Sequence, residues 1–226
     1  MPFHIEQREA DSMRKHRCLL SLLSIALLAF APLVTAAVSS TSYSPPATEK
    51  SLSTIVAPDP MDAAFRAGVA SYETGDYDGA VRAWRVPAEH GHVGAQFTLG
   101  VAYATGKGVI SDIARAVALW ESAAAHGHAA AQFNLGVIYS RGEGVDKDMT
   151  KARMWWHLAA NRGDAAAQFH LGVLAVTGEG GPRNLEEAAH WWRQSAAQGF
   201  EQAAKGLQIL REHGALLDDT HSSNYQ

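Results

Sequence analysis

Residues 131–163 read AQFNLGVIYSRGEGVDKDMTKARMWWHLAANRG, and the chain repeats this phrase at a constant interval. One copy begins at Ala95 and another at Ala167. The glutamine at the second position recurs every 36 residues, at Gln96, Gln132 and Gln168. Self-similarity at a fixed period of this length is typical of stacked repeat architectures, so the phrase predicts the fold class before any single residue is considered.

Each copy predicts a helix, a loop, a second helix and a turn. Ala131, Leu135 and Tyr139 recur at i, i+4 and i+8, which places them on one stripe of a first helix. Gly136 lies inside that helix, where glycine costs about 1 kcal/mol relative to alanine. Because this glycine recurs at Gly100 and Gly172, we expect a close approach of the partner helix to offset the cost.

The second half of the phrase indicates how the next helix begins and ends. The glycines of Arg141-Gly-Glu-Gly-Val145 permit positive φ, and Asp148 or Thr150 is suited to cap the following helix. In that helix Ala152, Trp156 and Ala160 again mark one stripe, with Trp156 on the inward side. A closing glycine, Gly163, is expected as the C-cap.

The predicted fold is all-α: an α-solenoid of about three full helix-turn-helix repeats between atypical ends. Residues 62–91 form a degenerate first repeat with a shorter loop, and Pro87 is expected to bend or restart its second helix. Residues 200–213 resemble a first helix without a partner, which is typical of a terminal cap.

The N-terminal region predicts export. Arg14, Lys15 and Arg17 precede an apolar run over 19–34, and small residues follow at Ala36 and Ala37. The domain prediction is a signal peptide over 1–36, a Ser/Thr/Pro-rich linker over 37–60, the solenoid over 61–213 and a flexible tail over 214–226. The expected location is periplasmic or secreted after cleavage near Ala36/Ala37, and an uncleaved anchor is the alternative.

Composition excludes several classes of function. The formal net charge is −4 without a long run of one sign, which argues against a nucleic-acid partner. Cys18 is the single cysteine and leaves with the predicted signal, so no disulfide is expected in the mature chain. No nucleophile elbow and no HExxH motif occurs, so we predict no catalytic residue, no metal site and no cofactor.

The repeated residues resemble the Sel1-like repeat family, relatives of the tetratricopeptide repeats. The resemblance rests on the alanine, Leu-Gly, tyrosine, Gly-x-Gly-Val loop, aspartate, tryptophan pair, Ala-Ala and closing glycine of residues 131–163, and covers about 62–213. It implies an α-solenoid that holds other proteins. The expected partner is a protein or peptide, and an envelope or membrane protein is one candidate. A disulfide-bridged subset of the family implies the alternative, an envelope hydrolase acting on glycans or β-lactams, but its cysteine pairs are missing here.

The candidate partner-binding residues lie on a second stripe of the first helices. Phenylalanine and valine recur there, edged by Asn134 and His170, and stacking would turn the stripes into one ladder on the concave face. The set is Phe97, Val101, Phe133, Asn134, Val137, Phe169, His170 and Val173. An apolar groove for a peptide is one interpretation. Filling of the gaps between successive first helices is the other, and the two remain open at this point.

Two further sets of side chains have structural and functional interpretations. His90 and His92 flank Gly91, and the pattern recurs around Gly127, but histidines near helix ends also interact favourably with the helix dipole. Trp155 and Trp191 are expected on a partly exposed flank, whereas the tryptophans of the inward position are expected in the core. That inward set is Trp84, Trp120, Trp156 and Trp192.

Overall fold

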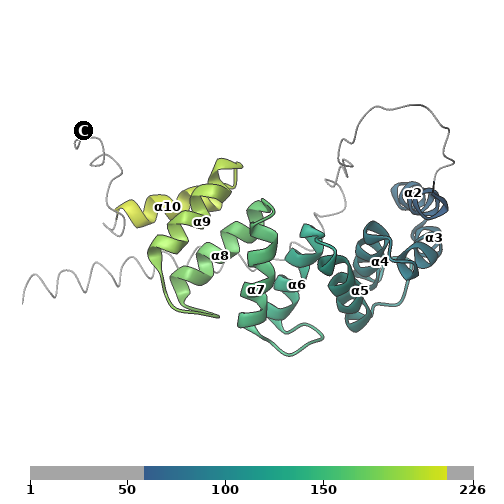
Figure 1. The fold of residues 1–226 in the computed structure, drawn as a ribbon, viewed down its shortest axis with the longest axis horizontal. Coiled ribbons are helices and arrows are strands. Elements are labelled where there is room, and N and C mark those ends of the chain that lie inside the picture. The colour runs from purple at the N-terminus through teal and green to yellow at the C-terminus, as the bar shows by residue number, and fades with distance from the viewer. Residues whose placement is uncertain (1–58, 213–226) are drawn as a thin grey trace, which may run out of the picture. The chain divides into compact units, whose positions relative to one another are not determined.

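The computed structural model describes residues 59–212 (Figure 1). Predictions for the signal peptide over 1–36, for the linker up to residue 58 and for the tail over 214–226 lie outside these residues. The described part consists of helices and turns, without a strand, which confirms the all-α solenoid. The helices are α2 Pro60–Glu73, α3 Tyr77–Glu89, α4 Val93–Thr105, α5 Ile113–Ala125, α6 Ala129–Arg141, α7 Met149–Ala160, α8 Ala165–Thr177, α9 Leu185–Ala197 and α10 Glu201–Glu212. None of these helices is long and apolar enough to cross a bilayer.

The described residues fall into two compact units. Residues 59–138 and 142–146 form the N-terminal unit, and residues 139–141 and 147–212 form the C-terminal unit. In the N-terminal unit α2 packs on α3, α3 on α4 and α4 on α5. In the C-terminal unit α7 packs on α8, α8 on α9 and α9 on α10. Within each of these two series, every helix contacts its neighbours in sequence, as stacked hairpins require.

Side-chain caps explain where the helices begin. The carboxylates of Asp112 and Asp148 accept hydrogen bonds from the N–H groups of Arg115 and Lys151, at 3.0 and 2.9 Å. Asp148 is thus the cap of its helix, as one of the two sequence alternatives predicted. Such a cap satisfies one of the four N–H groups that the first turn of a helix leaves without a partner.

The helix ends differ slightly from the prediction. Gly106 ends α4 as a left-handed C-cap, with φ of 71°, and the first glycine of the other two loops does the same. Gly163 is not the C-cap of α7, because Asn161 takes that place and Gly163 follows in the turn with φ of 90°. In the first repeat, α3 continues through Pro87 without restarting, and Pro87 is buried.

In three of the hairpins a tryptophan of the second helix lies on a glycine of the first. Trp84, Trp120, Trp156 and Trp192 are at most 2% exposed, which confirms their inward assignment. A Cβ added to Gly100 would lie 2.5 Å from Nε1 of Trp120, and Gly68 and Gly172 face Trp84 and Trp192 in the same way. The indole N–H of Trp120 donates to the carbonyl of Phe97 at 3.2 Å. Close approach therefore explains the helical glycine at Gly100 and Gly172, as predicted.

The second glycine of each Gly-x-Gly loop has a separate reason. A Cβ on Gly108 would overlap the carbonyl of Tyr77, and one on Gly144 would come within 2.6 Å of the Ile113 side chain. Gly180 meets Met149 in the same way. In each case the loop packs against the first residue of the preceding repeat's second helix, so the motif couples successive repeats as well as turning the chain.

Candidate functional site

The predicted ladder is mostly inside the protein. Seven of its eight side chains are between 2% and 9% exposed, and Phe133 is half-buried. Phe97 stacks on the ring of His128 with centroids 4.4 Å apart. The ring centroids of Phe169 and Phe200 lie 5.0 Å apart. The structure therefore gives most of the ladder a packing role, in line with the second of the two interpretations.

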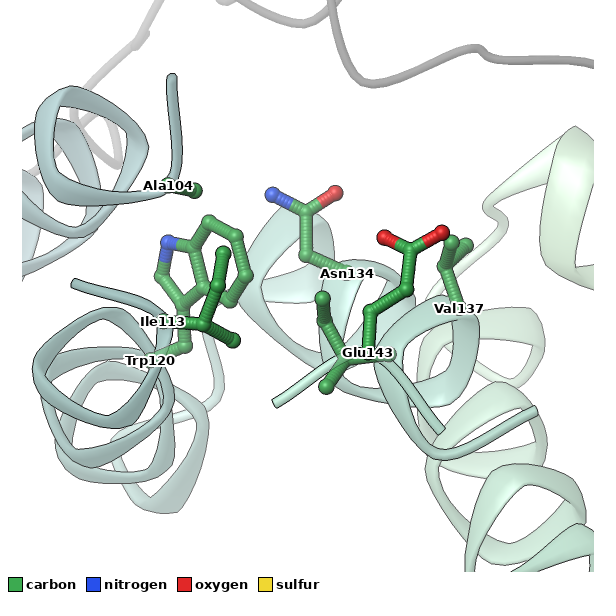
Figure 2. A pocket seen from close by; sticks show the side chains of 7 residues that line it. Ala104, Ile113, Trp120, Asn134, Val137 and Glu143 are labelled. Atoms are coloured by element: carbon green, nitrogen blue, oxygen red, sulfur yellow. The ribbon is translucent and has the colours of Figure 1, made fainter. Parts of the chain in front are cut away.

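The row opens at one pocket of the N-terminal unit (Figure 2). This pocket, with a volume of about 40 Å³, is bordered by the C-terminal half of α4, by α5, by α6 and by the loop after α6. Its lining residues are Ala104, Ile113, Trp120, Asn134, Val137, Ile138 and Glu143. Asn134 and Val137 belong to the predicted set, so the structure brings two of those residues together at a surface opening.

Asn134 is the polar centre of this pocket. In Figure 2 its carboxamide lies between the Trp120 ring and the Glu143 carboxylate. Asn134 is 5% exposed, and its Nδ2 is fully buried without a hydrogen-bond partner. An unpaired buried amide donor costs about 1–3 kcal/mol. Most buried polar groups in proteins are hydrogen-bonded, but Nδ2 of Asn134 and Oε1 of Gln132 on the same helix both lack a partner.

The corresponding positions in the other repeats are already engaged. Thr98 donates its hydroxyl to the carbonyl of Gly94 at 3.0 Å. His170 stacks on the ring of Trp156, with centroids 4.4 Å apart and planes 11° from parallel. One residue position of the repeat thus holds a helix-bonded threonine, a pocket amide and a buried imidazole.

Burial also controls the charge of two histidines. The pKa of His170 is lowered to about 4, first because burial disfavours the imidazolium and then because Arg141 is nearby. Burial lowers the pKa of His128 as well. Burial therefore favours the neutral form of both rings, and each of them stacks on an aromatic ring.

The other histidines considered from the sequence have structural roles. Nδ1 of His92 accepts a hydrogen bond from the N–H of Ala95, and His128 accepts from Ala131 in the next repeat, so both cap their helices. His90 bonds through Nδ1 to the carbonyl of Val86 at 2.9 Å, at the end of α3. These contacts occupy the Nδ1 nitrogen of each ring. Among the described residues, no group of three potential ligands lies close enough to hold one.

The predicted aromatic flank is only half right. Trp155 is partly exposed, as expected, but Trp191 is 6% exposed and belongs to the core. His157 and His190 both pack edge-on against the Trp191 ring, with centroids 5.3 and 5.1 Å away. Their imidazoles cover the ring that the sequence pattern left open to solvent.

Sequence reasoning missed Ala104, Ile113 and Glu143 as part of the site. Glu143 lies in the loop over 141–145, for which the sequence predicted only a turn. The signal that could have found the pocket is the polar residue at position 134, because it lies among apolar core residues and differs from the residues 36 positions before and after it.

Comparisons with known proteins agree with this architecture. A family model described as Sel1 repeat matches three times, over residues 93–128, 129–164 and 165–200. The chain is similar to a solved Sel1 repeat protein from Oxalobacter formigenes, with 32% identity and a TM-score of 0.64 over 66% of this chain and 62% of that one. No curated protein matches the chain.

A second solved structure is also similar. It is c5321, a protective antigen present in uropathogenic Escherichia coli strains that displays an SLR fold, with 33% identity and a TM-score of 0.66. The match covers 68% of this chain and 34% of c5321. The chain thus spans less than two thirds of the length of either structure.

Proposed function

Because the chain is a Sel1 repeat protein, we propose that it is an exported scaffold that binds a protein or peptide partner on the face formed by its first helices. Sel1 repeat proteins generally mediate protein–protein interactions. The finer elements of the proposal are that the chain is exported, that the partner binds on the face of the first helices, and that the partner is an envelope or membrane protein. Each has its own support and its own test.

The observation that carries the proposal is the pocket with the unpaired amide of Asn134. It is an opening in the row of first-helix residues, and its polar centre lacks the hydrogen bond that it would need inside a closed core. Its lining offers one carboxylate, from Glu143, and no hydroxyl, thiol or imidazole. Hydrolysis by a nucleophile and a base needs a pair of such groups within hydrogen-bond reach, so the lining favours binding over the hydrolase alternative.

Export is supported by the sequence before the solenoid. The basic cluster at Arg14, Lys15 and Arg17, the apolar run and the small residues at Ala36 and Ala37 follow the order of a cleaved signal. We expect a mature chain that begins at Ala37 or Val38. Intact mass spectrometry of the protein purified from the envelope fraction tests this, and a mass that includes the leader would replace the cleaved signal with an anchor.

Partner binding is tested by capture from a membrane extract with the tagged exported chain as bait. Excess untagged chain serves as the control, because a specific partner saturates and is displaced, whereas adhesion to the resin is not. We expect at least one protein that is captured by the bait and displaced by the competitor. If every captured protein survives competition, the scaffold proposal fails.

A further inference from the structure

Met154 is the exposed methionine of the described residues, and we propose that it is a site of reversible oxidation to methionine sulfoxide by peroxides. Hydrogen peroxide transfers one oxygen atom to the thioether sulfur, so the sulfur loses two electrons, the O–O bond breaks and water leaves. The inference goes beyond the proposed function, because it concerns the outer face of a second helix and a small oxidant. It rests on the exposure of Met154, on the side of α7 where it lies, and on the residues that the same position holds in another repeat.

The first observation is the difference in exposure among the methionines. Residues 59–212 contain Met61, Met149 and Met154. Met154 is 49% exposed, whereas Met61 and Met149 are partly buried. Met149 lies where α7 contacts the loop after α8, and a Cβ added to Gly180 of that loop would come 3.4 Å from the Cβ of Met149. Because a dissolved peroxide must collide with the sulfur, the fold directs the reaction toward Met154.

The second observation is that Met154 lies on the side of α7 that faces away from the core. The buried side of this helix holds Ala152, Trp156 and Ala159, each of which is fully buried. Met154 and Leu158 are one helical turn apart and are both exposed. A sulfoxide is polar, so it disrupts a core but remains hydrated at a surface. Oxidation of Met154 therefore leaves the buried side of α7 undisturbed.

The third observation is that the fold already accepts polar side chains at this position. Met154 corresponds to His190 on α9, which lies 36 residues later, and Leu158 corresponds to Gln194 in the same way. His190 is exposed, and its Nε2 lies 2.8 Å from Nε2 of Gln194. The same two positions thus hold an apolar pair in one hairpin and a hydrogen-bonded polar pair in the next. A sulfoxide at Met154 is an exchange of the same kind, so we expect α7 to remain helical.

Oxidation of Met154 changes the surface of α7 and not its fold. The sulfoxide oxygen accepts hydrogen bonds from water, so the exposed apolar pair of Met154 and Leu158 is replaced by a mixed polar surface. The change can be reversed, because methionine sulfoxide reductases return the sulfur to the thioether. Two thiols supply the two electrons of that reduction, and they leave as a disulfide while the oxygen leaves as water.

The test treats the full chain with hydrogen peroxide and follows each methionine over time by mass spectrometry of its peptides. We expect Met154 to gain one oxygen atom several-fold faster than Met61 and Met149. The same chain unfolded in urea is the control, and there the three rates should converge, because the fold no longer protects any sulfur. Equal rates in the folded chain, or the same preference for Met154 in the unfolded chain, would overturn the inference.

Two variants test whether a polar group at this position leaves the fold unchanged. Met154→Gln places a polar, uncharged side chain of similar length on the outer face of α7, and it should keep the helicity and the melting temperature of the wild type. Met149→Gln is the matched control, and it should lower the melting temperature because its side chain is partly buried. A loss in Met154→Gln as large as that in Met149→Gln would contradict the surface assignment.

Reversibility is measured on the folded chain after Met154 has been oxidised. The two classes of methionine sulfoxide reductase act on the two epimers of the sulfoxide, and together with dithiothreitol they should remove the added oxygen. Circular dichroism before and after this treatment should give the same helicity and the same melting temperature. Oxygen that stays on Met154 in the presence of both reductases would mean that the oxidation is permanent damage, and the inference would fail.

Discussion

Replacing Gly100 with alanine provides a test of the hairpin core in which two effects have opposite signs. In an exposed helix, glycine to alanine stabilises by about 1 kcal/mol, because alanine is the better helix former. At Gly100 the added Cβ would lie 2.5 Å from Nε1 and 2.7 Å from Cδ1 of Trp120. Real contacts of this kind are about 3.5–4.0 Å, so the indole ring must move. We therefore expect Gly100→Ala to destabilise the protein.

The expected magnitude follows from the contacts that the ring gives up. Overpacking a well-filled core costs about 1–3 kcal/mol. Displacing Trp120 also breaks its hydrogen bond to the carbonyl of Phe97, and an unpaired buried donor costs about 1–3 kcal/mol. Subtracting about 1 kcal/mol for helix propensity leaves a net loss of roughly 1–5 kcal/mol in the free energy of unfolding.

The assay is urea unfolding followed by far-UV circular dichroism, combined with a double-mutant cycle. In the Trp120→Leu background the ring is gone, so Gly100→Ala should reverse its sign and stabilise by up to about 1 kcal/mol. Hydrogen exchange of the Trp120 indole N–H gives a second measurement that does not need a complete unfolding curve. We expect this proton to exchange faster in Gly100→Ala.

Two outcomes would refute the account. If Gly100→Ala stabilises the wild-type chain, the glycine is not required by the ring. If its effect is equally unfavourable in the Trp120→Leu background, the cost arises from the helix and not from the contact with tryptophan.

Three further predictions concern the C-terminal unit. Trp156→Ala should cost about 3–5 kcal/mol and lower the melting temperature, and a melting temperature equal to the wild type's would contradict the core assignment. Glu187 forms an ion pair with Arg153 at 2.6 Å, and both side chains are largely buried. Glu187→Ala should therefore lower the free energy of unfolding by about 1–3 kcal/mol, and a double variant that also carries Arg153→Leu should recover part of this loss. Losses that add up in urea unfolding of the double variant would argue against the pair. The pKa of His170 is about 4 in the folded protein and 6.5 for the free group, so the stability that its neutral ring contributes is complete above pH 6.5 and falls by about 3 kcal/mol as the pH drops to 4. His170→Phe should flatten that part of the profile of stability against pH. An unchanged profile would assign the slope to other groups.

Much of the fold could be predicted because its determinants are local and repeated. Gly172 and Trp192 recur at the same spacing as Gly100 and Trp120, so a single physical explanation serves for both hairpins. The exceptions lie where an individual residue behaves differently from its class. Pro87 lies near the end of α3, at a position buried by its neighbours, and the helix continues through it. Trp191 is covered by two histidines from different helices, which no spacing rule would place together.

The site could be predicted only in part, because periodicity cannot distinguish a stripe that lines a groove from a stripe that fills a gap. Both consist of phenylalanine and valine at helical spacing. Phe97 and Phe169 prove to be packed against the rings of His128 and Phe200, each of which stands just before the first helix of the next repeat. Asn134 was included in the set, but its importance depends on the absence of a hydrogen-bond partner for Nδ2, and that depends on the three-dimensional surroundings of the side chain.

Variation within the repeat points to function more directly than its repetition does. The tryptophan, the glycines and the caps recur because every hairpin must solve the same packing problem, so they do not distinguish one hairpin from another. At the repeat position occupied by Thr98, Asn134 and His170, the residue differs from one repeat to the next, so this position is not fixed by the shared packing problem. There the threonine bonds to its own helix and the imidazole stacks in the core, whereas the asparagine leaves a donor unpaired beside a pocket. An unpaired buried donor lowers stability, and a ligand that accepts a hydrogen bond from Nδ2 would offset that cost.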